Sequence, residues 1–276
     1  MRLIEEYPRD PVVSCFIDRY QFYDIERTAF LKSVPNGKIE SWIIGNGSCQ
    51  LWNGDQEVFD PNKQSGFYPA SNSSAYFKIA GGFKCLNIKW NLDALGLPFF
   101  KRFLKDWSDF SLEEFVGTAA FLELSQFNLD SSGTLNVQRL DKIFEKSISR
   151  YKVDKKVVEM VFLIQNYFPH GFRIPELAEL MCVSTKTLER QIKNQLGLFP
   201  KELSNILRFS STTQYHLNQN RSPLFTESIK FGYYDQSHFI KECKKVTGYS
   251  PTEFFSKLKF STNDLILEND NLTKVI

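Results

Sequence analysis

The chain has 276 residues, with 34 lysines and arginines against 32 aspartates and glutamates, so its formal net charge is only +2. This length is long for one domain and comfortable for two. The five cysteines are scattered, odd in number and free of a Cys-x-x-Cys pair, which favours free thiols over a disulfide framework. No signal peptide or membrane-spanning segment is expected, and we expect a cytoplasmic protein.

Residues 1–92 form a β-rich region. Short segments of alternating or β-branched composition are separated by turn residues such as Pro35-Asn36-Gly37 and Asn53-Gly54-Asp55. Such regular spacing predicts an antiparallel sandwich or barrel. The expected strands are residues 15–20, 39–44, 48–52, 57–59, 66–68, 75–79 and 83–90.

Histidines are absent from this region, because His170, His216 and His238 all lie in the C-terminal half. A cupin-type metal site needs two or three imidazoles, so we expect no metal and no cofactor. Phosphate-binding loops, nucleophile elbows and clustered cysteines are also missing from the sequence. Enzymatic activity is therefore not expected.

The β-rich region is rich in aromatic residues, which either fill its core or line a ligand pocket. A ligand in such a pocket would be organic and partly apolar, because clustered cations or carboxylates are not evident in the lining. The aromatic residues are Trp42, Trp52, Trp90, Phe67, Tyr68, Tyr76, Phe77 and Phe83.

Residues 93–151 change to a helical period and form a connector. One face of its helices could pack on the β-rich region, and the other could pair with a second subunit. The two apolar stripes are Leu112, Phe115, Val116, Ala119 and Leu122, followed by Val137, Leu140, Phe144 and Ile148. A further apolar helix at 154–168 is expected to open a C-terminal domain over residues 152–260.

Within residues 184–255 a stretch recurs 51 positions later. Each copy is an amphipathic helix that stops at a glycine, with a proline three residues further on to start the next helix. A short helical segment and a tight connection precede each copy, which predicts two helix-turn-helix motifs. The matching residues are Leu188, Arg190, Ile192, Lys193, Gly197, Pro200 and Glu202 in the first copy, and Phe239, Lys241, Cys243, Lys244, Gly248, Pro251 and Glu253 in the second.

The second helix of each motif carries a polar stripe beside its apolar one. Arginine and lysine bind phosphates and guanine, glutamate pairs with cytosine, and glutamine pairs with adenine. Two such helices with matching stops favour DNA binding over an ordinary charged surface, and we expect His238 to contact phosphate or to pack. The candidate DNA-binding residues are Lys186, Glu189, Arg190 and Lys193 in the first motif, and Gln236, Ser237, His238, Lys241 and Lys244 in the second.

The charge distribution agrees with this assignment. Residues 170–260 hold 13 basic and 8 acidic residues, a balance of +5, whereas residues 1–169 hold 20 and 21, a balance of −1. A basic C-terminal part beside a neutral N-terminal part suits nucleic acid on one domain only.

Over about residues 155–258 the chain closely resembles the AraC/XylS family of transcriptional regulators. The resemblance implies a seven-helix DNA-binding domain whose recognition helices are separated by a linker helix at 201–219, and a cupin-like β-barrel at residues 1–92. The expected fold is therefore α+β, with a barrel, a helical connector and a C-terminal all-α domain with two helix-turn-helix motifs. The resemblance rests on Leu177-Ala178, Val183-Ser184, Leu188, Arg190, Gly197, Pro200, Arg208, Gly232-Tyr233, the run from Asp235 to Phe239, Lys244 and the run from Gly248 to Phe254.

The second motif departs from the family pattern at its supporting helix. Leu177-Ala178 of the first motif corresponds there to Glu227-Ser228. Burying these two polar residues would require hydrogen-bond partners. Either the helix rolls so that Ile229 and Phe225 point inward, or the second motif is less stable than the first.

The leading interpretation is a sequence-specific DNA-binding transcription regulator of bacterial type. Its two recognition helices would read successive major grooves, and its N-terminal domain would sense a small molecule or control dimerisation. The alternative is a ligand-independent DNA-binding regulator, controlled by its abundance or by a protein partner docking on the N-terminal domain. Expected partners are double-stranded DNA, RNA polymerase, a small-molecule effector and a second copy of the chain, without a membrane. Residues 261–276 are expected to form a polar tail.

Overall fold

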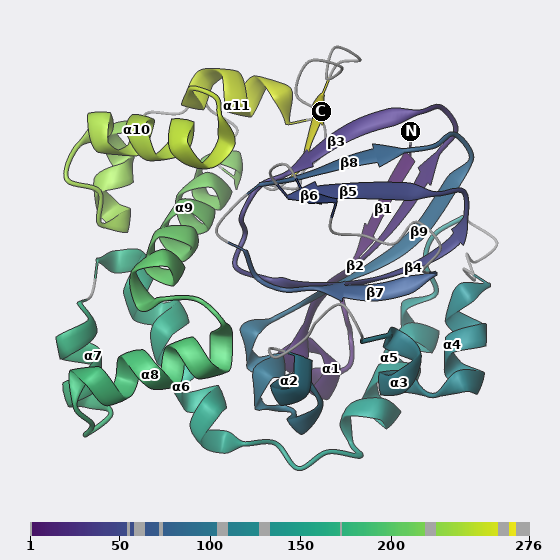
Figure 1. Cartoon of the computed structure of the whole chain (residues 1–276), viewed down its shortest axis with the longest axis horizontal. Helices are drawn as coiled ribbons and strands as arrows, with labels where there is room; N and C mark the ends of the chain where they lie inside the picture. Colours follow the sequence, from purple (N-terminus) through teal and green to yellow (C-terminus); the bar gives the residue numbers. More distant parts are fainter. Residues whose placement is uncertain are drawn as a thin grey trace.

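The computed structural model describes residues 2–53, 56–57, 64–71, 74–103, 110–126, 133–171, 173–218, 225–258 and 265–268. Two β-sheets lie on one side of the molecule, and most helices of the C-terminal half lie on the other (Figure 1).

Both sheets are antiparallel throughout their recorded pairings. In the first sheet the strand order is β1-β2-β9-β4-β7, and in the second it is β10-β3-β8-β5-β6. The first sheet consists of β1 (Arg2–Glu6), β2 (Ile17–Ile25), β9 (Phe83–Trp90), β4 (Ile39–Asn46) and β7 (Ser65–Tyr68). The second consists of β10 (Leu265–Glu268), β3 (Ala29–Ser33), β8 (Ala75–Ile79), β5 (Cys49–Asn53) and β6 (Gln56–Glu57).

A closed barrel, as expected for residues 1–92, does not form. In the part of the chain that the structure describes, no strand pairing joins one sheet to the other, so the region is an open two-layered arrangement. The prediction was wrong on this point because alternation along a strand shows only that one face is buried. Closure depends instead on which edges pair, and the sequence does not encode that locally.

Several short helices cover one end of the first sheet. Trp90 at the end of β9 is fully buried, and its indole packs against the rings of Phe100, Phe115 and Phe144. These contacts join sheet and helices into one apolar core. The helices are α1 (Pro11–Phe16), η1 (Leu92–Gly96), α2 (Pro98–Phe103), α3 (Leu112–Val116), α4 (Thr118–Ser125) and α5 (Val137–Ile148).

In this region the structure differs from the sequence-based prediction in two places. Residues 15 and 16, expected in a strand, end α1, because the side chain of Asp10 accepts hydrogen bonds from Val12 and Val13 and starts a helix. The apolar stripe from Leu112 to Leu122 is also interrupted. Gly117 has a φ of +89°, so α3 ends there and α4 leaves in another direction, with Ala119 and Leu122 exposed.

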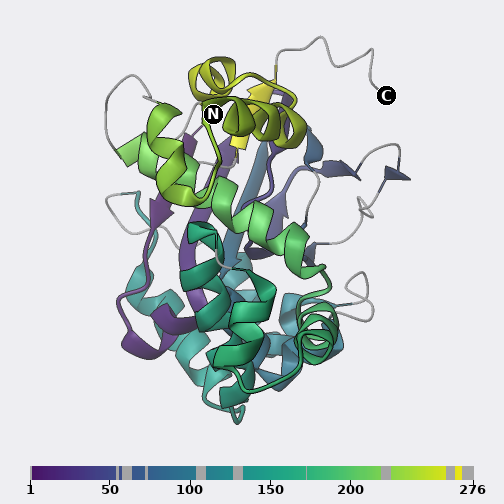
Figure 2. The same cartoon turned by 90° about the vertical axis from the view of Figure 1, so that its left-hand side faces the viewer.

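The C-terminal half is helical, as predicted. A first helix pair is formed by α7 and α8, and a second pair by η4 and α10. The predicted linker helix is present as α9, which is roughly 28 Å long for its 19 residues and runs between the two pairs (Figure 2). The elements are α6 (Lys155–Tyr167), η3 (Phe168–His170), α7 (Ile174–Leu180), α8 (Thr185–Leu196), α9 (Pro200–Asn218), η4 (Phe225–Phe231), α10 (Gln236–Thr247) and α11 (Pro251–Lys257).

Part of the expected polar tail belongs to the second sheet. Leu265 to Glu268 form β10, which pairs antiparallel with β3 from Ser33 to Phe30. The sequence segment Leu-Ile-Leu is apolar enough for a strand, and its partner lies more than 230 residues away. None of the described helices is long and apolar enough to cross a membrane.

Candidate nucleic-acid interface and adjoining cavity

The first helix pair has an apolar interior and well-defined ends. Leu177, Leu188 and Ile192 are fully buried between α7 and α8. Ser184 caps α8, because its hydroxyl accepts a hydrogen bond from the Thr187 amide at 3.2 Å. Gly197 ends α8 with a φ of +71°, a conformation that glycine adopts without strain.

The predicted polar stripe of α8 faces solvent. All four candidate side chains, Lys186, Glu189, Arg190 and Lys193, are exposed. Lys193 is already engaged at the end of its own helix, where its ammonium donates to the Gly197 carbonyl at 2.9 Å and lies 4.2 Å from the centre of the Phe199 ring. The other three candidates point away from the core and can meet a ligand together.

The helix α10 repeats this design. Asp235 caps α10 by accepting from the His238 amide at 2.7 Å, and Gly248 ends it with a φ of +79°. Phe239 and Cys243 are fully buried. The candidates Gln236, Ser237, Lys241 and Lys244 are exposed, as predicted from their positions.

His238 is the candidate that differs from the others. Its ring packs edge-on against Tyr233 at 5.2 Å, and its Nδ1 accepts a hydrogen bond from the Tyr234 amide at 3.3 Å. Its Nε2 lies 3.8 Å from a carboxylate oxygen of Glu242. The geometry therefore favours the packing role over a phosphate contact.

The element supporting α10 is a 3-10 helix, η4. Ser228 is fully buried, and its hydroxyl has no hydrogen-bond partner among the described residues. Ile229 is 57% exposed, so the expected alternative in which the helix rolls to bury this residue is wrong; the side chain of Phe225 lies outside the described residues. Glu227 stays at the surface, 3.4 Å from the ammonium of Lys230.

Two features near α10 were missed by the sequence analysis. Arg208 of α9 forms an ion pair with Glu242 of α10 at 2.9 Å and lies 4.6 Å from the centre of the Tyr233 ring. Burial raises the pKa of Glu242, and Arg208 opposes that rise. Tyr234 is 88% exposed beside the N-terminus of α10. Only its position next to the Asp235 cap could have indicated it.

The second sheet holds the C-terminal end of α10. The ammonium of Lys32, on β3, donates to the Thr247 carbonyl at 2.5 Å and lies about equally far from the rings of Tyr76 and Tyr249. The Ser74 hydroxyl donates to the Val246 carbonyl at 2.8 Å. A cation at a helix C-terminus is favourable because the unpaired carbonyls there carry partial negative charge.

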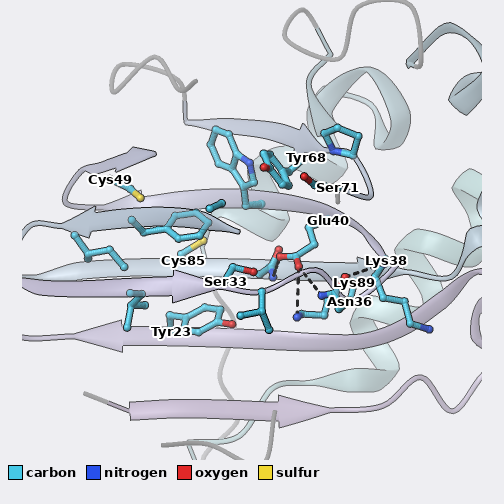
Figure 3. Close-up of a pocket in the computed structure, with 18 of the residues that line it drawn as sticks. Tyr23, Ser33, Asn36, Lys38, Glu40, Cys49, Tyr68, Ser71, Cys85 and Lys89 are labelled. Atoms are coloured by element: carbon cyan, nitrogen blue, oxygen red, sulfur yellow. Dashed lines mark hydrogen bonds and ion pairs between the residues drawn. The ribbon is translucent and has the colours of Figure 1, made fainter. Parts of the chain in front are cut away.

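A cavity lies between the two sheets, close to this contact (Figure 3). The volume of the cavity is about 100 Å³. Four of the predicted aromatic residues, Trp42, Tyr68, Phe77 and Phe83, line it, whereas Phe67 and Trp90 fill the core. The side chain of Trp52 lies outside the described residues. The aromatic residues therefore divide between the core and the wall of the cavity.

Charged groups gather at one end of the cavity, contrary to expectation. Lys38, Glu40 and Lys89 all line it. The ammonium of Lys89 lies 3.4 Å from Glu40, which also accepts hydrogen bonds from Asn36 at 3.2 Å and Asn87 at 2.9 Å. The expectation was wrong because these residues come from β4, β9 and the segment before β4, and only the strand pairing brings them together.

Two of the cysteines lie at the apolar end of the same cavity. Cys49 and Cys85 are buried, and burial raises the pKa of both thiols, that of Cys49 to about 12. They are therefore neutral, weakly polar groups in the cavity wall. In the described part of the chain, no three histidine, cysteine or acidic side chains come together as a metal site.

Sequence comparison finds a helix-turn-helix domain over residues 177–257. The chain is 28% identical to the arabinose operon regulatory protein of Escherichia coli over 153 residues, which are 55% of this chain and 51% of that protein. It is 25% identical to the HTH-type transcriptional activator RhaS of Yersinia pestis over 37% of each chain. The chain thus spans about half or less of the length of these curated relatives.

Among solved structures, ToxT from Vibrio cholerae has a similar fold. The TM-score is 0.53 at 12% identity, covering 87% of this chain and 98% of ToxT. A ToxT structure with a bound unsaturated fatty acid has the same TM-score and identity and covers 94% of this chain and 98% of ToxT. At these identities the likeness concerns the fold.

Proposed function

Because the chain belongs to the AraC/XylS family of transcriptional regulators, we propose that it is a sequence-specific DNA-binding regulator with α8 and α10 as its recognition helices. In this proposal residues 1–92 are the regulatory part, residues 93–151 connect it, and residues 152–260 bind DNA. The relatives named above are regulators rather than enzymes, which supports a function without catalysis.

The observation that carries the proposal is the shared design of α8 and α10. Each has two fully buried apolar side chains on its inner face, an N-terminal cap, a glycine end and an exposed polar stripe. An exposed stripe on a helix that is held rigidly from behind is what insertion into a major groove requires.

Each stripe offers a distinct set of contacts. On α8, Arg190 can bind guanine with two hydrogen bonds and Glu189 can accept from cytosine. On α10, Gln236 can pair with adenine and Lys241 with guanine. Lys186, Lys193, Ser237 and Lys244 would contact phosphates, which orient the protein without selecting a sequence. His238 would hold the turn before α10 through its Tyr234 contact.

The cavity between the sheets supports a small-molecule effector as the regulatory input. The fatty acid bound to ToxT supports an organic effector with an apolar part. Val34 lines the cavity and also belongs to the buried cluster of α9, α10 and α11, so an occupant would touch the support of the second recognition helix. RNA polymerase and a second copy of the chain remain the proposed protein partners. Regulation by abundance or by a docking protein is the alternative if the cavity takes no ligand.

Binding of the full chain to duplex DNA at several salt concentrations tests the proposal. Phosphate contacts by the three lysines Lys186, Lys193 and Lys244 predict a slope of log K against log salt of about −2.7, because each contact releases roughly 0.9 counter-ions. Fluorescence anisotropy with a labelled duplex measures this slope. Affinity that does not change with salt would contradict a basic DNA-binding face.

A further inference from the structure

The polar end of the cavity is built from a buried ion pair. Lys89 is only 2% exposed, yet its ammonium lies 3.4 Å from Glu40. Burial opposes ionisation of Glu40, but Lys89 and the amides of Asn87 and Asn36 outweigh that effect, so the pKa of Glu40 is below its usual value. Glu40 is therefore an ionised carboxylate at neutral pH.

A second ion pair continues from the first. The ammonium of Lys38 lies 3.1 Å from Asp18 and donates to Asn91 at 2.7 Å. Asp18 also accepts from Arg19 at 2.7 Å, and Arg19 reaches Glu5 at 3.3 Å. Burial opposes ionisation of Asp18 as well, yet its two cations hold its pKa below the usual value.

The charges of this network cancel. Its three cations, Lys38, Lys89 and Arg19, face three carboxylates, Glu40, Asp18 and Glu5. Among the described residues that line the cavity, Lys38, Glu40 and Lys89 are the charged ones, and each already has an oppositely charged partner. A ligand carboxylate would therefore meet Glu40 or would have to displace it from Lys89. Leaving a desolvated charge unpaired is costly.

The opposite end of the cavity is apolar. Ile44, Phe77, Ile79 and Phe83 line it, beside the neutral thiols of Cys49 and Cys85. In Figure 3 the labelled cysteines lie at one end and Glu40, Lys89 and Asn36 at the other. The cavity thus has one polar and one apolar end, and each charged group at the polar end is paired with an opposite charge.

We propose that this cavity takes an uncharged amphiphile, with a polar head that both donates and accepts hydrogen bonds and an apolar tail. The head lies against Glu40 and its neighbouring amides, and the tail extends toward Phe77 and Phe83. This inference rests on the proposed effector function of the cavity and adds the chemical class of the ligand.

Octanamide, octanoate and octylammonium test the proposal on the full chain, because they share a tail and differ in head charge. Calorimetric titration at pH 7.5 should show octanamide binding at least about tenfold more tightly than either ion, since an unpaired charge in a desolvated site costs more than one decade of affinity. Tighter binding of octanoate or octylammonium would overturn the inference while leaving an effector cavity in place.

Glu40→Gln sharpens the test because it leaves the positive charge of Lys89 without its carboxylate. This variant should prefer octanoate over octanamide, a reversal of the wild-type order. Glu5→Gln is the matched control, because it removes a carboxylate of the same network that does not line the cavity, and it should keep the preference for octanamide. A folded Glu40→Gln protein that still prefers octanamide would contradict the charge argument.

The remaining outcomes are also decisive. If Glu40→Gln does not fold, the three ligands on the wild type decide between an uncharged and a charged head. If no ligand of the series binds the wild type, both this inference and the effector function fail. DNA binding, measured separately, is unaffected by that result.

Discussion

The two helix pairs present similar outer faces on different supports. In the first pair, α7 and α8 pack through Leu177, Leu188 and Ile192 into the same apolar core that holds Trp90 of the sheet. In the second pair, α10 belongs to a small separate cluster around Phe239. A recognition helix can therefore keep its outward chemistry while its support changes, because only its buried face meets the rest of the protein.

The support of the second pair comes partly from the second β-sheet and the segments beside it. Val34 contributes to its core, and Lys32 and Ser74 bind the last carbonyls of α10. Its own supporting helix is the weaker part, because the hydroxyl of Ser228 is buried without a hydrogen-bond partner among the described residues. The difference indicates that α10, unlike α8, depends for its placement on contacts with the β-rich region.

The largest loss of stability is expected from removing a buried ring from the apolar cluster around α10. Phe239→Ala should cost about 3 to 5 kcal/mol of unfolding free energy, because the ring is fully buried in a small cluster. Native-state hydrogen exchange should show the loss of protection in α10 and α11, with α7 and α8 nearly unchanged. Leu188→Ala is the counterpart and should expose amides of α7 and α8. If Phe239→Ala lowers protection equally in α8, the two helix pairs unfold together, which would contradict their having separate supports.

Removing the cation at the end of α10 should have the next largest effect. Lys32→Met keeps most of the side-chain volume but loses the charge-assisted hydrogen bond to Thr247, at a cost of about 1.5 to 3 kcal/mol. Urea denaturation measures the loss, and exchange of the last-turn amides of α10 locates it. Lys78→Met, at an exposed position of the same sheet, should be nearly neutral. Equal effects of the two substitutions would show that the second sheet does not hold α10.

A comparable effect is expected on DNA recognition. If α8 and α10 enter successive major grooves, the selected site should contain two short boxes about 10 base pairs apart. Arg190→Ala should relax one box and Lys241→Ala the other, each at a cost of about 1 to 3 kcal/mol. Lys193→Ala should weaken all sites alike. In vitro selection with the wild type and the three variants provides the measurement, and a shared box for Arg190 and Lys241 would refute the two-groove arrangement.

The smallest expected effects are changes in stability of opposite sign for a serine in each of the two helix pairs. Ser184→Ala removes the cap of α8 and should destabilise the protein by about 1 kcal/mol. Ser228→Ala removes a buried hydroxyl without a partner and should be neutral or stabilising by up to about 1 kcal/mol. Thermal or urea denaturation of both variants measures these changes in unfolding free energy. Destabilisation by Ser228→Ala would mean that the hydroxyl has a bonding role in the second pair.

The sequence by itself was sufficient for the parts governed by local spacing. The recurrence of Phe239 with Leu188 and of Gly248 with Gly197 predicted two amphipathic helices with defined ends, and i, i+3, i+4 spacing was enough to place Arg190 and Lys241 on exposed faces. The departure at Glu227-Ser228 was also visible, because it compares equivalent positions of one repeat. Within each copy, the helix, its ends and its exposed face depend on residues only a few helical turns apart.

Only the tertiary structure decided the features that join distant segments. The sheets remain open because edge pairing, rather than alternation, closes a barrel. Ser228 turned inward and Ile229 outward, since the packing of η4 against its neighbours overrides the apolar preference of one side chain. Lys32 meets Thr247 across 215 residues, and Glu40 meets Lys89 through the register of β4 with β9. Such contacts follow from how elements pack against one another, which residue spacing along the chain does not specify.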